Sequence, residues 1–410
     1  MLNDYAKPVS ELEMLGIDTK EIAMANIVFV PLPEFGHLNP TFKLARSLMK
    51  NGHCIYYLGI PDREKYINHQ GFKFISIFSQ ACPKGWLYKD AAPVIDNLGR
   101  MLLQIGQTYA GDVLNEIREA IKKCGADLLL IDLMLRDLVM VGDNLGIPCA
   151  LYSTSLIEGY LKFIRSDYDP ADNLPVLILC PKELDIPHSN RRSGRYYVEA
   201  CVDPERKDLD PFPWDKVDDT KRLIYCSLGS QCHQYRQSRS FFRTTIDAMR
   251  GNPEWQLILT IGPCLNIADF QPSPENVVIV NWAPQLEILK RSSLMMNNAA
   301  LGSVKECIFL GVPMIVFPVM WDQPANAERV VYHGLRVRGD INSVSVDQIR
   351  NLVDSLDNPM FKRRIDSISK IFHQIEESEI SVKIIDGILD GTSGFFPSPD
   401  TKKSGLSRSK

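Results

Sequence analysis

Residues 26–37 read NIVFVPLPEFGH, and this stretch decides the fold. Residues 26–32 form a short β-branched and apolar run that ends at Pro33, which is typical of a buried strand. A helical pattern then opens at Pro40 and stops at Asn51 and Gly52, before a second apolar run. Strands that are apolar throughout and alternate with helices predict a parallel sheet with both faces covered.

The alternation continues through the first half of the chain. We expect further strands at residues 54–60, 72–77, 126–132 and 149–153, and helices at residues 62–70, 91–123 and 136–145. From residue 157 to 219 the rhythm breaks, because Pro, Asp and Arg are common there. Residues 203–217 are typical of an exposed linker between domains.

The same alternation restarts after this linker. The expected strands are residues 222–227, 255–262, 277–282, 294–297 and 314–319, and the expected helices are residues 237–250, 304–310 and 323–332. Two open α/β sheets joined by one linker predict two Rossmann-like domains with a ligand cleft between them.

We therefore divide the chain into five parts. They are an N-terminal extension (1–23), an N-terminal domain (24–205), a linker (206–218), a C-terminal domain (219–390) and a disordered tail (391–410). The strand pattern begins directly after Met24, so the sequence leaves open whether translation starts at Met1 or at Met24.

The composition excludes several classes of protein. Among 410 residues, 46 Lys and Arg face 50 Asp and Glu, for a net charge of −4, so we expect no nucleic-acid partner. Apolar runs fall far below the ~18 residues of a membrane span, and the first residues do not form a secretory signal. The ten cysteines stand singly, which indicates core residues in a reducing compartment. These features predict a cytoplasmic two-domain enzyme.

Two candidate catalytic residues stand where strands of the first sheet end. His37 follows the first strand and Asp132 ends the fourth, so both side chains should project at the carboxyl edge of the sheet. A carboxylate that accepts an imidazole N–H fixes the tautomer of a histidine base. Each residue also has a plainer interpretation. His37 is alternatively a capping or exposed loop residue, and Asp132 the cap of the next helix.

Residues 281–334 are more specific and read NWAPQLEILKRSSLMMNNAALGSVKECIFLGVPMIVFPVMWDQPANAERVVYHG. This stretch resembles the donor-binding signature of the family 1 UDP-dependent glycosyltransferases, of the macrolide and secondary-product type. Residues 29–53, FVPLPEFGHLNPTFKLARSLMKNGH, resemble that family's first strand, catalytic-histidine loop and first helix. The likeness extends from Met24 to about Leu389 and implies the α/β GT-B fold, with two Rossmann-like domains around a cleft.

The resemblance implies a role for individual residues. His37 would be the base that removes the acceptor proton, and Asp132 the carboxylate that orients it. Trp282 would stack on uracil, Gln285 and Glu306 would face the ribose, Ser230 and Ser303 the diphosphate, and Asp322 and Gln323 the transferred sugar. The donor-binding residues implied in full are Ser230, Trp282, Ala283, Gln285, Asn298, Ala300, Gly302, Ser303, Glu306, Asp322 and Gln323.

Three departures from the family pattern bear on function. Asn298 stands where the family usually has a histidine, and Ala300 where a glycine is common. Asparagine still donates an N–H but carries no positive charge, and the alanine methyl group needs space near the diphosphate. The stretch between Ser153 and Pro181 is short, so we expect a shallow or open acceptor pocket.

Other patterns are weak. Residues 167–169 (DYD) resemble a metal-binding D-x-D but lie in a Pro- and Asp-rich stretch, which favours a solvated turn. The remaining histidines lack metal-ligand spacing, and only His233, close to the SLGS loop, lies near the expected site. We expect no metal and no cofactor besides a UDP-sugar co-substrate.

The function that fits best is an inverting, metal-independent glycosyltransferase. It would move a hexose from a UDP-sugar to a hydroxyl group of an apolar small molecule, either a natural product or a lipid-like acceptor. Asp322 and Gln323 favour a donor with intact ring hydroxyls, such as UDP-glucose. The alternative is a non-catalytic GT-B protein that activates or scaffolds a partner enzyme, which Asn298 and Ala300 suggest. A GT-B epimerase is less favoured, because the signature is that of a transferase.

Overall fold

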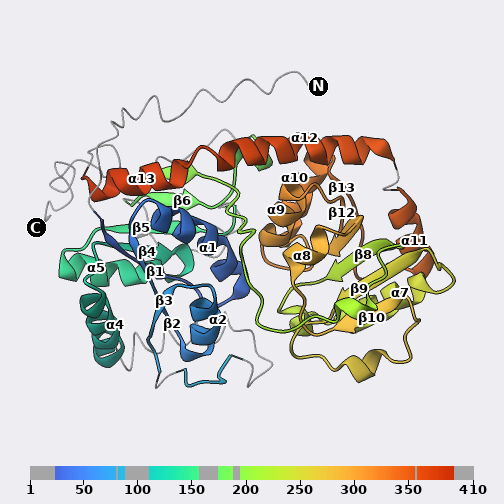
Figure 1. Cartoon of the computed structure of the whole chain (residues 1–410), viewed down its shortest axis with the longest axis horizontal. Helices are drawn as coiled ribbons and strands as arrows, with labels where there is room; N and C mark the ends of the chain where they lie inside the picture. Colours follow the sequence, from blue (N-terminus) through green and yellow to red (C-terminus); the bar gives the residue numbers. More distant parts are fainter. Residues whose placement is uncertain are drawn as a thin grey trace, which may run out of the picture.

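The computed structural model describes residues 24–79, 82–87, 110–156, 174–187, 194–355 and 358–391. Two parallel sheets lie next to each other, each flanked by helices (Figure 1). The strand order is β3-β2-β1-β4-β5-β6-β7 in the N-terminal sheet and β10-β9-β8-β11-β12-β13 in the C-terminal sheet. The prediction of an α/β protein with two Rossmann-like domains is confirmed.

The N-terminal sheet contains all of the strands predicted for it and two more. Its strands are β1 (Asn26–Val30), β2 (Cys54–Gly59), β3 (Lys73–Ser76), β4 (Leu128–Asp132), β5 (Cys149–Ser153), β6 (Val176–Ile178) and β7 (Arg195–Tyr197). Its helices are α1 (Phe35–Lys50), α2 (Glu64–His69), α4 (Ala110–Cys124) and α5 (Val139–Leu145), with 3₁₀ turns η1 (Pro61–Arg63) and η3 (Leu133–Leu138). Strands β6 and β7 have three residues each, too few to produce a visible pattern in a Pro- and Asp-rich stretch. Part of the helix predicted at residues 91–123 lies outside the described residues.

Helix α1 begins earlier than predicted, at Phe35 instead of Pro40. The Glu34 carbonyl accepts the N–H groups of His37 and Leu38 at 2.9 Å each, which closes a helical turn ahead of the proline. Pro40 lies in the second turn of α1, where it removes one i→i−4 hydrogen bond, and the helix continues through it. The correction matters because it places His37 in the first turn of a helix, not in a loop.

The C-terminal sheet contains the five predicted strands and one more, at residues 336–338. Its strands are β8 (Arg222–Ser227), β9 (Trp255–Thr260), β10 (Val277–Val280), β11 (Leu294–Asn297), β12 (Met314–Val316) and β13 (Arg336–Arg338). The helices of this half are α7 (Ser238–Met249), α8 (Gln285–Leu289), α9 (Leu301–Phe309), α10 (Gln323–Tyr332), α11 (Val346–Ser355) and α12 (Pro359–Glu376). The predicted helices at residues 237–250 and 323–332 are confirmed, and α9 starts three residues before its predicted position.

The last helix requires a correction to the predicted domain limits. Helix α12 packs on α9 of the C-terminal domain, and the chain then continues across the top of the molecule as α13 (Ile380–Leu389) (Figure 1). Val382, Ile385 and Ile388 of α13 are buried in the core of the N-terminal sheet. The domain predicted for residues 219–390 therefore gives its last helix to its neighbour, because the apolar face of α13 is buried there.

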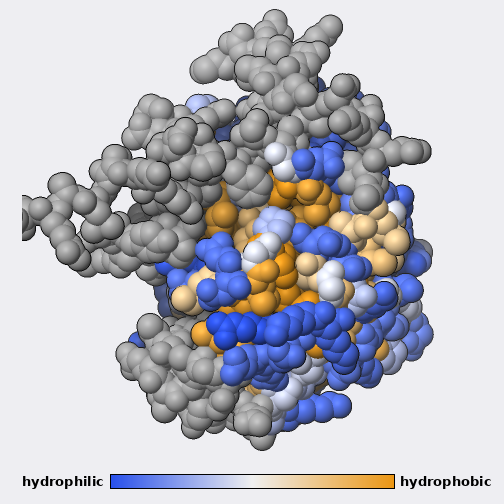
Figure 2. All heavy atoms as spheres, turned by 90° about the vertical axis from the view of Figure 1, so that its left-hand side faces the viewer, coloured by the Kyte–Doolittle hydropathy of each residue, from blue (hydrophilic) through white to orange (hydrophobic). Residues whose placement is uncertain are grey.

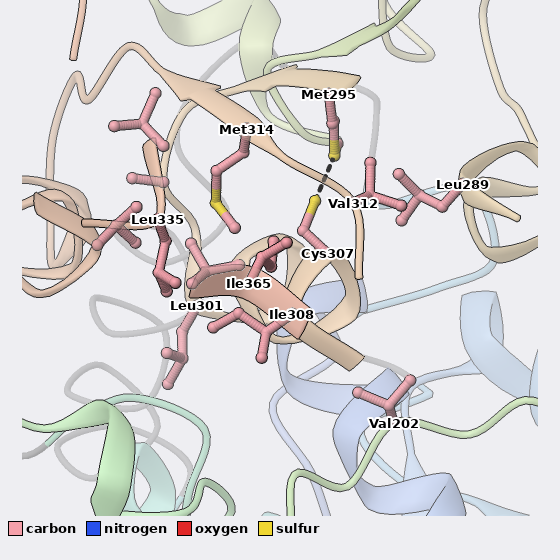
Figure 3. Close-up of a cluster of buried hydrophobic side chains, with 14 of the residues drawn as sticks. Val202, Leu289, Met295, Leu301, Cys307, Ile308, Val312, Met314, Leu335 and Ile365 are labelled. Carbon is pink, nitrogen blue, oxygen red and sulfur yellow. Dashed lines mark hydrogen bonds between the residues drawn. The ribbon is translucent and has the colours of Figure 1, made fainter. Parts of the chain in front are cut away.

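An apolar core connects the two domains. One cluster contains Ile178 and Val202 from the N-terminal half together with Met295 and Cys307 from the C-terminal half. Figure 3 shows this cluster, in which Cys307 Sγ lies 3.4 Å from Met295 Sδ and Val202 lies on the side of the N-terminal domain. Because close-packed interiors have low compressibility, this cluster fixes the separation of the two domains.

The other structural predictions concern cysteines and membrane spans. Eight of the ten cysteines are buried, whereas Cys54 is half-buried and Cys264 is exposed, so the interpretation as core residues is confirmed for eight. No helix in the described ranges combines the length and the apolar composition that a bilayer span requires. The end of the N-terminal domain that faces away from its neighbour shows apolar residues across its middle, next to hydrophilic ones (Figure 2).

Candidate functional site

The carboxyl ends of the two sheets open onto one cavity of about 580 Å³. The N-terminal domain contributes His37, Thr154 and Ser155 to its wall, and the C-terminal domain contributes the loops that follow β8, β10 and β11. Every donor-binding residue that the sequence predicts lines this cavity, and Asp132 lies behind His37. The structure therefore brings the predicted residues together, although they come from stretches almost 300 positions apart.

His37, in the first turn of α1, faces Asp132 at the end of β4. The Nδ1 atom of His37 is 2.7 Å from Asp132 Oδ2, and the two side chains are 12% and 1% exposed. Asp132 Oδ1 accepts the N–H of Met134 at 2.9 Å, which fixes the carboxylate and also caps η3. Thr154 Oγ1 lies 3.2 Å from the same histidine nitrogen. Asp132 thus fulfils both of its interpretations, as a helix cap and as the partner of a histidine.

The charge state of His37 is set by two opposing effects. Burial disfavours the imidazolium, but the charge and hydrogen bond of Asp132 favour it more strongly, with help from Glu34 and Asp322. The net effect raises the pKa of His37 above its ordinary value of 6.5. When Nδ1 donates its proton to the carboxylate, the lone pair of the neutral ring resides on Nε2. This is the nitrogen that a base at this position uses.

The start of α9 provides a second feature, a set of main-chain donors. Ala300 is the N-cap of α9 and makes no side-chain capping hydrogen bond, so the first turn formed by Leu301, Gly302 and Ser303 presents its N–H groups. Ser230, in the loop after β8, lines the same cavity. A helix N-terminus of this kind is suited to a diphosphate, because N–H groups and the helix dipole both favour negative charge.

Asn298 precedes this turn, and its side chain is committed to the protein. Its Nδ2 donates to the Leu228 carbonyl at 2.8 Å, and its Oδ1 accepts the N–H of Ala300 at 3.2 Å. Ala299 between them adopts a left-handed φ of 61°. Asn298 therefore ties the loop after β8 to the start of α9, and its contact with a diphosphate stays a prediction.

A third group of residues surrounds an aromatic ring. Trp282 is half-buried in the cavity wall, and its ring centroid is 4.4 Å from that of Phe35 at an angle of 43°. Gln285 Nε2 donates to Glu306 Oε2 at 2.6 Å and lies 3.3 Å from Ser303 Oγ. Ala283 is buried beside them. A flat aromatic side chain next to a buried carboxylate suits a planar base that carries a sugar with hydroxyl groups.

The loop before α10 closes the cavity from the C-terminal domain. The hydroxyl of Ser155 donates to Asp322 Oδ2, so this contact connects the two domains. Gln323 is 4% exposed, its Oε1 accepts N–H groups from residues 319–320, and its Nε2 donates to Tyr235 at 3.1 Å. Asp322 thus faces the other domain across the cavity, whereas the amide of Gln323 holds its own loop in place.

Sequence reasoning missed several polar residues in this site, among them Ser155, which contacts Asp322. The structure adds Thr154 beside His37, Tyr235 beside Gln323, and the linker residues Arg206 and Asp208. Arg206 and Asp208 lie in the stretch predicted to be an exposed linker. That prediction is wrong for this part, because the Arg206 side chain is only 5% exposed and pairs with Glu306. Only the charge pattern of residues 203–208 (DPERKD) hinted at such contacts.

Three other predictions concern residues away from this geometry. The D-x-D motif at residues 167–169, and much of the short stretch expected to shape the acceptor pocket, lie outside the described residues. His233 does not line the cavity, and burial lowers its pKa. Within the described part of the chain, no three His, Cys, Asp or Glu side chains come close enough to hold a metal ion.

Comparison with known proteins finds the chain similar to glycosyltransferases. Residues 269–378 match the family model described as UDP-glucoronosyl and UDP-glucosyl transferase. The chain is 23% identical over 365 residues to an NDP-glycosyltransferase of Bacillus subtilis, which covers 81% of this chain and 88% of that protein. It is 24% identical over 392 residues to an oleandomycin glycosyltransferase of Streptomyces antibioticus, with 85% and 87% covered.

Solved structures agree with the fold. The crystal structure of the glycotransferase of kitacinnamycin superposes with a TM-score of 0.70 at 22% identity, covering 90% of this chain and 99% of that one. These matches confirm the GT-B fold, the resemblance to the UDP-dependent glycosyltransferases, and the prediction of a glycosyltransferase enzyme. They leave the roles of individual residues as predictions.

Proposed function

We propose that this protein is an inverting glycosyltransferase that moves a hexose from a UDP-sugar to a hydroxyl group of an apolar small molecule. The observation that carries the proposal is the pair formed by His37 and Asp132, which shares one cavity with the start of α9 and with Trp282. A proton acceptor, an anion site and a surface for a planar nucleobase thus border the same cavity. The relatives named above, one of which is named for oleandomycin, support a natural product as acceptor.

In the proposed reaction the acceptor oxygen attacks the anomeric carbon from the face opposite the diphosphate. His37 Nε2 takes the hydroxyl proton as the new C–O bond forms and the bond to the diphosphate breaks. Asp132, 2.7 Å from Nδ1, stabilises the resulting imidazolium. The negative charge that develops on the departing UDP meets the N–H groups at the start of α9.

The remaining roles follow from position in the cavity. Trp282 would carry the uracil on its ring, and Glu306 the ribose hydroxyls. Asp322 would hold a hydroxyl of the transferred hexose. Its Oδ2 accepts from Ser155 and Asn326, and a carboxylate has further acceptor positions for a ligand. We propose that the reaction needs no metal ion, because the N–H groups at the start of α9 would stabilise the negative charge of the diphosphate. Location in the cytoplasm stays a prediction.

The alternative is a non-catalytic protein that retains the fold. Asn298 motivates it, because its side chain is tied to Leu228 and Ala300. Against it stands the intact pair of His37 and Asp132, since a scaffold has no need of a buried histidine held by a buried carboxylate. The two functions differ in whether UDP is released from a donor.

The test uses thermal stabilisation first and turnover second. A ligand that binds only the native state raises the melting temperature, so UDP, UDP-glucose and other nucleotide sugars can be screened without knowing the acceptor. UDP release is then measured with the stabilising donor and a panel of apolar phenols and alcohols. His37→Ala should abolish release while UDP still stabilises the protein.

Wild-type turnover in His37→Ala would refute the role of the base. Binding of UDP without any release by the wild type, either to acceptors or to water, would favour the scaffold. Absence of stabilisation by any nucleotide or nucleotide sugar would refute the donor site itself.

A further inference from the structure

The linker between the domains forms one wall of the predicted nucleoside site. Asp203 Oδ2 accepts a hydrogen bond from Arg46 Nε at 3.0 Å. Gln70 clamps the main chain of Lys207, because its Nε2 donates to the Lys207 carbonyl at 2.7 Å and its Oε1 accepts the Lys207 N–H at 3.0 Å. Residues 203–208, which we term the strap, are thus fastened to the N-terminal domain.

From this fixed position the strap extends two side chains to the C-terminal domain. Arg206 NH1 donates to Glu306 Oε1 at 2.6 Å, and Asp208 Oδ1 accepts the indole N–H of Trp282 at 3.0 Å. Trp282 and Glu306 are the residues predicted to carry the base and the ribose of the nucleotide. The strap therefore contacts both halves of the predicted nucleoside site.

Both oxygens of Glu306 are engaged by protein donors. Arg206 donates to Oε1 and Gln285 Nε2 donates to Oε2, each at 2.6 Å, and the side chains of Arg206 and Glu306 are 5% and 9% exposed. A buried carboxylate without such partners would depend on the ligand to satisfy it. Here the carboxylate is already satisfied, so its stability does not require two ribose hydroxyls.

This arrangement determines how strongly the site distinguishes one nucleotide from another. A site that relies on a ligand hydroxyl rejects the analogue lacking it, because a buried polar group is then left unpaired. With Arg206 and Gln285 in place, a nucleotide without a 2′-hydroxyl leaves no oxygen of Glu306 unpaired. A carboxylate has about four acceptor positions, so the 3′-hydroxyl can still bind.

We infer that Arg206 is a specificity-determining residue that relaxes discrimination at the 2′ position, so that this site accepts ribonucleoside and 2′-deoxyribonucleoside diphosphates alike. The inference rests on the proposed function, because it requires a nucleoside diphosphate at Trp282 and Glu306. The inference extends the proposed class of donor to nucleotide sugars that contain either ribose or 2′-deoxyribose.

The experiment compares UDP with 2′-deoxy-UDP, which differ only in the 2′-hydroxyl. Calorimetry on the full-length wild-type protein should give dissociation constants within about threefold of each other. Arg206→Met keeps an unbranched apolar stem and removes both the charge and the N–H donors of the side chain. In this variant Glu306 Oε1 loses its protein donor, so it should take one from the ribose. The preference for UDP should then rise at least about tenfold, since hydrogen bonds to charged groups are the stronger ones. Lys207→Met is the matched control, because Lys207 is exposed and the clamp uses only its main chain.

Three results would overturn the inference. The first is a wild-type protein that binds UDP at least tenfold more tightly than 2′-deoxy-UDP. This result would overturn the inference without any variant and would leave the proposed function intact. Another is an Arg206→Met protein that binds both nucleotides more tightly by the same factor, which would make Arg206 a competitor of the ribose. If neither nucleotide binds the wild type, the proposed function fails as well. Should Arg206→Met not fold, Arg206→Lys, with fewer donors for Glu306, should show a smaller rise in the same ratio.

Discussion

Replacing Asp132 by Asn tests the catalytic pair at constant size. The Asn amide oxygen would keep the hydrogen bond from the Met134 N–H, now 2.9 Å from Asp132 Oδ1, which turns its NH₂ group toward His37. An NH₂ donor at Nδ1 forces the ring proton onto Nε2, the nitrogen that should accept the proton of the acceptor. The base would then be in the wrong tautomer.

The expected loss is large because it combines a tautomer change with a lost charge. General base catalysis contributes about 10²–10⁴-fold, and removing the carboxylate of a histidine pair costs about 10⁴-fold where the geometry is kept. We therefore expect kcat to fall about 10³–10⁴-fold, equivalent to roughly 4–5.5 kcal/mol at 1.36 kcal/mol per factor of ten. UDP affinity should be unchanged, because Asp132 lies behind His37 and does not line the cavity.

The pH profile provides an independent measurement. The base works only when neutral, and the pKa of His37 is raised above 6.5, so wild-type activity should increase as the pH rises through that higher value. Burial lowers this pKa, and the charge of Asp132 opposes burial. In Asp132→Asn the acid limb should therefore shift to lower pH.

The control is Thr154→Val, which removes the 3.2 Å contact to the same nitrogen without changing any charge. It should keep kcat within about tenfold of the wild type. Asp132→Asn with kcat near the wild-type value, or with an acid limb at higher pH, would refute this reasoning.

Three further predictions concern nucleotide binding and stability. Trp282→Ala should weaken UDP binding by about 1–3 kcal/mol, because the stacking surface for the nucleobase is lost. Trp214→Ala is the control: it removes a ring that packs on Phe212 outside the cavity, so calorimetry should give an unchanged dissociation constant for UDP. Burial raises the pKa of Glu376 from 4.5 to about 7. Between these two pH values the folded state binds a proton that the unfolded state has lost, so the stability of the fold decreases as the pH rises. Glu376→Gln should therefore raise the free energy of unfolding, measured in urea, by roughly 1–3 kcal/mol at pH 8 and leave it unchanged at pH 4.5. Gly339→Ala would press a Cβ against the buried Phe317 ring and should destabilise the fold by about 1–3 kcal/mol. Gly36→Ala is the control, because no atom lies within 4 Å of its added Cβ, and it should leave the stability unchanged. Equal urea midpoints for the two variants would contradict this prediction.

Local patterns in the sequence carried much of the fold. Strands such as β8, β11 and helix α10 have the predicted bounds, because the periodicity of apolar residues reflects which faces an element buries. Short elements escaped this reasoning. β6 and β7 depend on neighbouring strands for their pairing. The start of α1 is set by the hydrogen bonds that the Glu34 carbonyl accepts, and not by Pro40.

The candidate site divides in the same way. His37, Asp132 and most of the donor-binding residues were predictable as cavity residues, because the strand-end rule places the first pair and residues 281–334 form one contiguous motif. Ser230 lies outside that motif, in the loop after β8. Arg206 on Glu306, Asp208 on Trp282 and α13 on the N-terminal sheet join positions up to hundreds of residues apart. The sequence by itself determined which elements form and which chemistry gathers at their ends, since both are properties of neighbouring residues. Only the tertiary structure decided which charges meet across the cleft, because a buried ion pair depends on where the folded linker holds each side chain.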